Sequence, residues 1–586
     1  MEFSVTSLGP RGTAAAEVLL TTLAAAGIER LWFCSGSELV PLQEAAARMR
    51  AREERCPALA PAIHEHVAIC AAMGESMVTG RPVAVAAHAD LGPLNFGAEL
   101  HTAFRGGYPL LILSGYPATH PERRTSQAFW NQQRWDHGEA LRQYTKWDYR
   151  VAAHEPLGTV VARALQVART EPTGPVQLTV PAEVLAAATV VGGPDSADRL
   201  AVAGHGGGHE PGIREIARRL LGADRPLLLT ERAGKDPRAV HLLAELCERY
   251  ALGCRSTRFR MSLPSQHPAQ LAAPRVPDAD VVLVLEHHVP WIPAVDPPGS
   301  DTWVAVVGQD PIAAEIPLHE LGADLRMYAA PAEFLTALLA ELDRQAPKHH
   351  ERTRRRAERL AGDAQAAGAE LERARRDALA EPHLTHAALG AALDQVLHPD
   401  DILVDELGDT LGLSRRSEPG TLFQNGGSSL GWATSACVGA GLAAPDRVVV
   451  CSTGDGAYLF GGPAAALWAQ RRYDVPVLTV IANNGGYRTG TSHVDDYYPD
   501  GEVARTQDYT GGVFDPVPDH AAEARAAGAV AFTVSTPAEL LAALAEGREI
   551  VRRHRTPVVV DALLPTHTGD RHAGPAHGTS HGKARR

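Results

Sequence analysis

The stretch Cys451-Ser452-Thr453-Gly454-Asp455-Gly456-Ala457 decides the fold together with a second one, Ile481-Ala482-Asn483-Asn484-Gly485-Gly486-Tyr487. Residues 447–450 before the first stretch predict a buried strand, residues 463–472 a helix, and residues 475–482 a second apolar strand. The two polar stretches therefore end successive parallel strands and lie at one edge of one sheet. Open parallel sheets bind ligands at this edge, because the carboxyl ends of the strands form a crevice there.

Oxygen donors are concentrated at this predicted edge. An aspartate, an asparagine amide and a nearby backbone carbonyl supply the hard oxygen ligands that magnesium prefers, and they leave positions for diphosphate oxygens and water. Glycines on both sides allow the backbone to approach phosphate groups closely. The sequence thus predicts a magnesium and phosphate site, against the simpler alternative of a turn without a ligand.

The spacing from Gly454-Asp455-Gly456 to Asn483-Asn484 resembles the cofactor motif of thiamine diphosphate enzymes. GDG alone is a common turn sequence, whereas strand, GDG, helix, strand and NN in succession form a specific pattern. The resemblance implies that Asp455, Asn484 and the carbonyl of Gly486 hold magnesium. It also implies cofactor contacts for the residues around them, namely Gly454, Gly456, Ala457 and Tyr487.

The composition is that of a soluble globular chain too long for a single core. Its 586 residues are 45% hydrophobic and 21% charged, and they carry a formal net charge of -13. No dense basic patch is visible, so no nucleic-acid partner is expected. Seven scattered cysteines without a CxxC pair favour a reduced, cytoplasmic location. No basic and apolar leader and no run of about 18 apolar residues occurs, so neither secretion nor a membrane span is expected.

Apolar strands alternate with helical segments in three blocks, which predicts an α/β fold with three doubly wound parallel-sheet domains. The strands named by the pattern are 30–33, 83–87, 109–114, 176–180, 226–230, 281–285, 303–307 and 401–405. The predicted boundaries are 1–190, 205–345, 346–382 for a charged connecting helix that faces water, 383–570, and 571–586 for a disordered tail. The order of blocks is similar to that of the thiamine diphosphate-dependent 2-oxo acid decarboxylase and acetolactate synthase superfamily. That resemblance implies pyrimidine-binding, central and diphosphate-binding domains.

A glutamate is the candidate activator of the cofactor. The segment Ile63-His64-Glu65-His66-Val67-Ala68 is similar to the family's glutamate helix. By resemblance, Glu65 bonds the aminopyrimidine ring of a cofactor that is anchored on the partner subunit, and it promotes the imino tautomer. The simpler alternative is a carboxylate that only stabilises the start of its helix.

A loop that precedes a helix of small residues is predicted to bind the middle of the cofactor. The segment Asn425-Gly426-Gly427-Ser428-Ser429-Leu430 resembles the family's loop at this place. The resemblance implies that the Ser428 carbonyl accepts from the aminopyrimidine and that Leu430 wedges between the two rings, which orients the amino group. An ordinary core leucine is the alternative for Leu430. Further contacts are implied for the end of the strand 401–405, at Glu406, Leu407 and Gly408.

Substrate-side groups come from the resemblance to benzoylformate decarboxylase in particular. The segment Ala87-His88-Ala89-Asp90 resembles the loop with that enzyme's active-site histidine, and His88 can pass protons near neutrality. Ser37 aligns with its serine that binds the substrate carboxylate. Three further histidines are either site or surface residues, namely His287, His288 and His493.

Two departures from the family bear on the substrate. Ala89 stands where pyruvate decarboxylase has its second histidine, and Gly490 or Thr491 stands where that enzyme has a glutamate after NN. Decarboxylation of pyruvate to acetaldehyde is therefore not supported. The aromatic and polar segment 129–136 is assigned to interface packing rather than to a pocket.

The resemblance implies a thiamine diphosphate and magnesium enzyme that adds the cofactor carbanion to a 2-oxo acid and releases carbon dioxide. The enamine is then protonated, or ligated to a second carbonyl as in an acetolactate synthase-like carboligase, and both outcomes stay open. FAD is unsupported by the sequence, although its presence would favour the synthase group. The family also implies a homodimer or homotetramer with active sites shared between subunits.

Two other classes of function are less well supported. A nicotinamide dehydrogenase is disfavoured, because no GxGxxG opens a helix after a strand. A catalytically inactive regulatory relative of the same fold is expected to lose one of the key residues, yet Glu65, Asp455 and Asn484 are all present.

Overall fold

The computed structural model describes residues 14–124, 127–153, 155–187, 201–256, 259–271, 275–408 and 412–566. The tail predicted over 571–586 lies outside these residues. The chain forms two compact units. The first contains residues 1–203, 425–445 and 460–475, and the second contains residues 204–424, 446–459 and 476–586.

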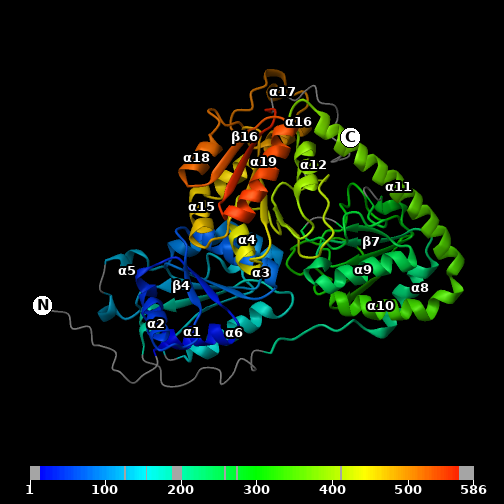
Figure 1. The fold of residues 1–586 in the computed structure, drawn as a ribbon. Helices are drawn as coiled ribbons and strands as arrows, with labels where there is room; N and C mark the ends of the chain where they lie inside the picture. The colour runs from blue at the N-terminus through cyan, green and yellow to red at the C-terminus, as the bar shows by residue number, and fades with distance from the viewer. Residues whose placement is uncertain are drawn as a thin grey trace. The chain divides into compact units, whose positions relative to one another are not determined.

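The first unit is built on a six-stranded parallel sheet in the order β2-β1-β3-β4-β6-β5. The strands are β1 (Arg30–Phe33), β2 (Ala58–Pro61), β3 (Val83–Ala87), β4 (Leu110–Tyr116), β5 (Trp147–Arg150) and β6 (Val176–Pro181). The helices are α1 (Ala15–Ala25), α2 (Val40–Ala51), α3 (Glu65–Thr79), α4 (Leu91–Gly106), α5 (Ala128–Asn131), α6 (Leu157–Arg169) and α7 (Ala182–Ala186). The blue and cyan ribbon of this sheet, with α1 and α6 beside it, can be followed in Figure 1.

Two helices from later in the chain also belong to this unit, namely α13 (Trp432–Ala443) and α15 (Pro463–Arg472). Helix α13 packs on α3 with backbone against backbone. A Cβ on Gly74 would lie 1.8 Å from the carbonyl oxygen of Ala436, and a Cβ on Gly439 would lie 1.8 Å from that of Ala71. Only glycine fits at these two crossings, so the helix that begins at Glu65 is held in a fixed position.

The second unit contains a five-stranded parallel sheet in the order β11-β10-β9-β7-β8. Its elements are α8 (Glu210–Gly222), β7 (Pro226–Thr230), α9 (Pro237–Tyr250), β8 (Gly253–Ser256), β9 (Val281–Leu285), β10 (Trp303–Gly308), β11 (Leu325–Tyr328) and α10 (Pro331–Gln345). One face of the sheet packs against α8, α9 and α10. The other face packs against connecting segments, with Trp291 and Leu321 in its core.

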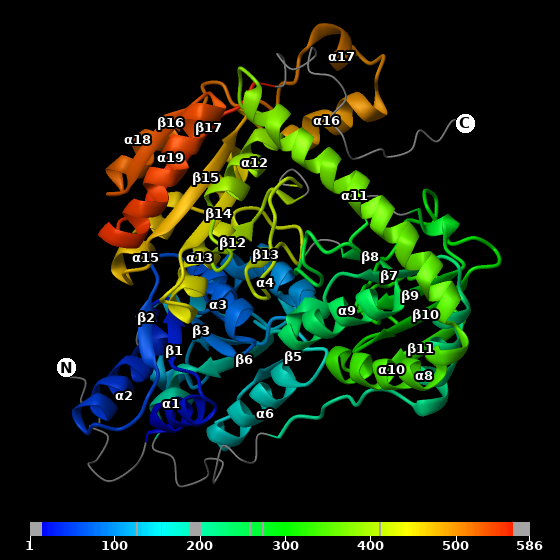
Figure 2. The same ribbon diagram turned by 45° about the vertical axis from the view of Figure 1, so that its right-hand side comes forward.

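The long helix α11 (His350–Ala380) follows the central sheet, and Figure 2 shows it running from α8 to α12. Most of its side chains are exposed, which is the environment expected for the charged helix predicted over 346–382. Arg356 is an exception, because it is buried and donates to the carbonyls of Leu220 (2.7 Å), Ala223 (3.1 Å) and Tyr250 (2.7 Å). These carbonyls belong to the ends of α8 and α9, where helices leave acceptors unpaired. The helix is thus fastened to the central domain.

The third sheet, also in the second unit, has six parallel strands in the order β13-β12-β14-β15-β17-β16. Its strands are β12 (Ile402–Asp405), β13 (Leu422–Gln424), β14 (Val449–Gly454), β15 (Val477–Asn483), β16 (Val530–Val534) and β17 (Val558–Leu563). Its helices are α12 (His386–Val396), α14 (Asp455–Phe460), α16 (Arg488–Tyr497), α17 (Glu502–Thr506), α18 (His520–Ala526) and α19 (Pro537–Glu549). The predicted α/β class with three parallel sheets is confirmed.

The edge predicted from GDG and NN is confirmed. Strands β14 and β15 are neighbours and pair in parallel, with Gly454 opposite Ala482. Strand β14 starts two residues later than predicted and continues through the polar residues to Gly454. Both polar stretches therefore lie at the same carboxyl edge. Among the described residues, no helix is long and apolar enough to cross a membrane.

Candidate active site

The Asp455 side chain lies at the junction of β14 and α14 and is only 1% exposed. Its carboxylate accepts hydrogen bonds from the backbone N–H of Gly456 and of Gly486, both at 2.9 Å. These bonds bring two of the three predicted magnesium ligands together. Burial raises the pKa of Asp455, although the amide donors act in the opposite direction. A divalent cation beside this carboxylate would offset the cost of burying its charge.

The two asparagines of the NN pair have different environments. Asn483 is buried, donates to Asp561 at 2.9 Å and accepts from the backbone N–H of Gly485 at 3.2 Å. Asn483 therefore fixes the turn after β15, and Asn484 is the half-buried member of the pair. This agrees with the assignment of Asn484, rather than Asn483, as a ligand.

The backbone around these donors is closely packed. A Cβ on Gly456 would lie 2.6 Å from the ring of Tyr487, and one on Gly486 would lie 2.2 Å from the carbonyl oxygen of Gly512. Ala457 is buried in the first turn of α14, beside the half-buried Gly454. The hard oxygen donors and the glycine backbone fit a magnesium diphosphate.

Asp405, at the end of β12, is a positioning residue that the sequence reasoning missed. It is buried and accepts from Ser452 Oγ (2.5 Å), Gln424 Nε2 (2.8 Å) and the backbone N–H of Leu407 (3.0 Å). It thereby holds the turn with the predicted contacts Glu406, Leu407 and Gly408, and Glu406 accepts from Thr453 Oγ1 at 3.0 Å. The signal was available, because Asp405 ends an apolar strand beside the GDG strand.

Glu65 is the first residue of α3, as predicted, and the residue as a whole is half-buried. The His64 side chain caps the helix by accepting from the backbone N–H of His66 at 3.1 Å. The Glu65 carboxylate accepts from Asn95 Nδ2 at 2.9 Å. Asn95 was not assigned a role from the sequence, and the structure makes it the group that orients Glu65.

His88 is paired with a buried carboxylate that was also not predicted. Glu38 is 1% exposed, and its two oxygens lie 2.8 and 2.9 Å from His88 Nδ1. Burial by itself raises the pKa of Glu38. The hydrogen bond from His88, backbone N–H donors and the charge of His88 together outweigh burial and lower that pKa. The bond to Glu38 raises the pKa of His88 in turn. Ser37 donates to the same carboxylate at 3.3 Å.

Gln132 corrects the assignment of segment 129–136 to interface packing alone. Its Nε2 lies 2.6 Å from His88 Nε2, so this residue belongs to the candidate site. Trp135 of the same segment is 96% exposed. The side-chain contact between positions 88 and 132 has no signature in the local sequence.

The loop of residues 425–431 is anchored by its central serine. Ser429 is buried, donates to Glu99 Oε2 at 2.7 Å and lies 2.6 Å from Thr102 Oγ1. Its neighbours face outward, and Leu430 is 41% exposed. Leu430 is therefore not a core leucine, and both predicted contacts, Ser428 and Leu430, are presented on the outside of the loop.

The three further histidines fall elsewhere in the second unit. His287 is buried after β9, where burial and the charges of Arg255 and Arg232 lower its pKa to about 3. The His288 carbonyl accepts from His319 Nε2 at 2.8 Å. His493 is exposed on α16.

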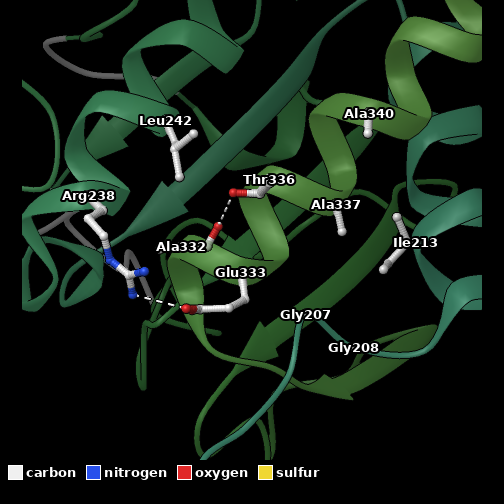
Figure 3. A pocket seen from close by; sticks show the side chains of 10 residues that line it. All are labelled: Gly207, Gly208, Ile213, Arg238, Leu242, Ala332, Glu333, Thr336, Ala337 and Ala340. Atoms are coloured by element: carbon white, nitrogen blue, oxygen red, sulfur yellow. Dashed lines mark hydrogen bonds and ion pairs between the residues drawn. The ribbon is translucent and has the colours of Figure 1, made fainter.

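The central domain also contains an open pocket of about 550 Å³. Figure 3 shows it along α10, with Arg238 of α9 paired to Glu333. No predicted site residue lines this pocket, which separates it from the candidate active site.

The comparisons with known proteins agree with this geometry. The model of the thiamine pyrophosphate enzyme N-terminal TPP binding domain matches residues 13–140, and that of the C-terminal TPP binding domain matches residues 407–562. Benzoylformate decarboxylase of Pseudomonas aeruginosa is 26% identical over 452 residues, which cover 72% of this chain and 78% of that protein. The 2-hydroxyacyl-CoA lyase of Oryza sativa subsp. japonica is 25% identical over 93% of this chain and 94% of its own.

A solved structure is similar in fold. The thiamine diphosphate-dependent 4-hydroxybenzoylformate decarboxylase of Rhodococcus jostii RHA1 superposes with a TM-score of 0.73 at 20% identity, over 94% of this chain and 99% of that one. Together with the two TPP binding domains, these relatives define the family. The chain belongs to the thiamine diphosphate-dependent superfamily of 2-oxo acid decarboxylases and acetolactate synthases, and it is an enzyme of the decarboxylase or carboligase type.

Proposed function

We propose that this protein is a thiamine diphosphate- and magnesium-dependent decarboxylase of a small 2-oxo acid. The observation that carries the proposal is the buried Asp455 carboxylate, held by amides from both polar stretches at one sheet edge. When bound, thiamine diphosphate supplies the nucleophilic carbon and the electron sink that decarboxylation requires.

The chain's own residues have distinct tasks in this proposal. Asp455, Asn484 and the carbonyl of Gly486 hold magnesium and thereby the diphosphate. Glu65, oriented by Asn95, holds a proton at the aminopyrimidine. The Ser428 carbonyl and Leu430, on the outside of their loop, set the conformation of the cofactor.

The pair of Glu38 and His88 favours protonation over carboligation. Nδ1 of His88 faces the Glu38 carboxylate, so proton exchange with a bound substrate would use Nε2. Because Nε2 lies 2.6 Å from Gln132 Nε2 in this structure, the substrate would have to take the place of that amide. Glu38 stabilises the charged imidazolium, which makes His88 a proton donor near neutrality. A positioned proton donor delivers a proton to the product carbon in competition with a second carbonyl.

The active unit in this proposal is a homodimer or homotetramer in the cytoplasm, in which each site takes Glu65 from one subunit and Asp455 from another. Closed symmetric assemblies dominate among soluble oligomers. An acetolactate synthase-like carboligase is the competing reaction for the same residues.

The proposal is tested by releasing the cofactor from purified protein and by assaying 2-oxo acids. The cofactor is released by denaturing the protein and is then oxidised to its fluorescent thiochrome product. The amount of thiamine diphosphate measured in this way should be proportional to the amount of protein chain. A panel of aromatic and aliphatic 2-oxo acids should then show carbon dioxide release with the aldehyde as product. Products with a new carbon–carbon bond would identify the carboligase instead, and absence of both cofactor and turnover would contradict the proposal.

A further inference from the structure

A second group of ligating side chains lies in the first unit, between α3 and α4, and the proposed reaction does not use it. It consists of His66, Cys70 and Glu99, whose ligand atoms all lie within 4.8 Å of one another. His66 and Cys70 are one helical turn apart on α3, so their side chains project from the same face. Cys70 is fully buried and Glu99 is 2% exposed.

The hydrogen bond to a carbonyl fixes which nitrogen of His66 carries hydrogen. Nε2 lies 3.2 Å from the carbonyl oxygen of Gly431, and a carbonyl can only accept, so Nε2 is the N–H of the neutral ring. The lone pair of Nδ1 then faces Glu99 Oε1 at 3.5 Å. Two acceptors at this distance repel unless something positive lies between them, and 3.5 Å is long for a proton shared in a hydrogen bond.

The spacing of the three groups is that of ligands around one tetrahedral metal ion. Zinc bonds of about 2.0 Å to nitrogen or oxygen and about 2.3 Å to sulfur place neighbouring ligand atoms roughly 3.3 to 3.5 Å apart. The separation from His66 Nδ1, the nitrogen without the hydrogen, to Glu99 Oε1 is 3.5 Å, and the ligand atoms of all three side chains lie within 4.8 Å of one another. A ligating histidine commonly donates its other ring N–H to a carbonyl that fixes the orientation of the ring, and the Gly431 carbonyl would have this role here.

We propose that His66, Cys70 and Glu99 bind a zinc ion. One thiolate, one imidazole and one carboxylate suit zinc and are a poor set for magnesium, which prefers oxygen ligands alone. The fourth position is taken by the Ser429 hydroxyl, which already contacts Glu99 Oε2 at 2.7 Å, or by water. On binding, the Cys70 thiol loses its proton to solvent.

Such an ion would connect the two helices that orient the cofactor activator. Glu65 begins α3 one residue before His66, and Asn95 lies on α4 one turn before Glu99. Zinc would hold these helices in register, so its role is structural. The test of the zinc site does not depend on the proposed reaction, because metal content is measured without cofactor or substrate.

The test is metal content of the full-length protein, expressed with zinc in the medium and dialysed without chelator. Elemental analysis should find about one zinc per chain in the wild type and in a Cys56→Ala control, whose cysteine is half-buried and outside the group. Cys70→Ala and Glu99→Gln should each weaken zinc binding more than about 100-fold. Equal zinc in Cys70→Ala and wild type, or none in folded wild type, would overturn the proposal.

Cobalt substitution is measured on the wild-type protein and therefore does not require any variant to fold. Wild-type protein stripped of metal and loaded with Co²⁺ should gain the strong visible absorption of a four-coordinate ion and a near-ultraviolet thiolate band. Folded wild-type protein without a thiolate band has no Cys70 ligand. That result would also overturn the zinc site, whether or not the protein binds thiamine diphosphate.

Discussion

At the level of single residues, the proposed reaction depends on carboxylates that are held by identified partners. Glu65→Gln should still bind the cofactor but lose most turnover, because a neutral amide cannot favour the protonated aminopyrimidine. Asn95→Ala should cost only about tenfold, since it removes one hydrogen bond to a charged group. Hydrogen–deuterium exchange at the reactive cofactor carbon measures both effects, and exchange at the wild-type rate in Glu65→Gln would remove Glu65 from the mechanism.

The Glu38 and His88 pair predicts a pH window of stability. Glu38 has a lowered pKa, so its contribution is complete above its unfolded value of 4.5 and is lost as pH falls through its folded value. His88 has a raised pKa, so its contribution is complete below 6.5 and is lost as pH rises through its folded value. The difference in unfolding free energy between wild type and Glu38→Gln should therefore be largest between pH 4.5 and 6.5. A difference that does not change with pH would mean that the two groups do not form an ion pair.

At the scale of the element, the contact of α3 with α13 leaves no room for a methyl group. Gly74→Ala and Gly439→Ala should each cost more than the roughly 1 to 3 kcal/mol typical of overpacking, because the new Cβ meets a backbone carbonyl. Gly97→Ala on α4 is the matched control, since nothing lies within 4 Å of its added Cβ, and it should be neutral or stabilising by up to about 1 kcal/mol. Chemical denaturation measures all three, and similar stabilities for Gly74→Ala and Gly97→Ala would contradict the close crossing.

Elements with a local signature were predictable from the sequence, and contacts between distant positions were not. Strands β1, β3, β7 and β9 have the predicted bounds, because each is a short apolar run that ends at polar residues. The edge strands β5 and β16 were not predicted. Most of their residues are half-buried, and the charged residues Asp148 and Arg150 interrupt the apolar pattern of β5. The pairs formed by Glu38 with His88 and by Glu99 with Ser429 depend on topology, which brings together positions 50 and 330 residues apart.

At the scale of the whole molecule, the shared site predicts complementation between inactive variants. A hybrid of Glu65→Gln and Asp455→Ala subunits contains one site built from two unmutated halves. Mixing the two inactive proteins after dissociation and reassembly should restore part of the activity, up to about a quarter of the wild-type level for random pairing into dimers. Hybrids that form but stay as inactive as both parents would show that Glu65 and Asp455 act within one subunit.

Magnesium and thiamine diphosphate are expected to bind at the adjacent ends of β14 and β15. Calorimetric titration of protein from which metal and cofactor have been removed measures this binding directly. Wild type and the exposed control Asp446→Ala should bind thiamine diphosphate only with magnesium present, and their melting temperatures should rise by mass action. Asp455→Ala and Asn484→Ala should bind at least about 100-fold more weakly, because each removes an oxygen ligand from the ion that anchors the diphosphate. Tight binding that is equal in Asp455→Ala and wild type, or no binding by folded wild type, would contradict this expectation.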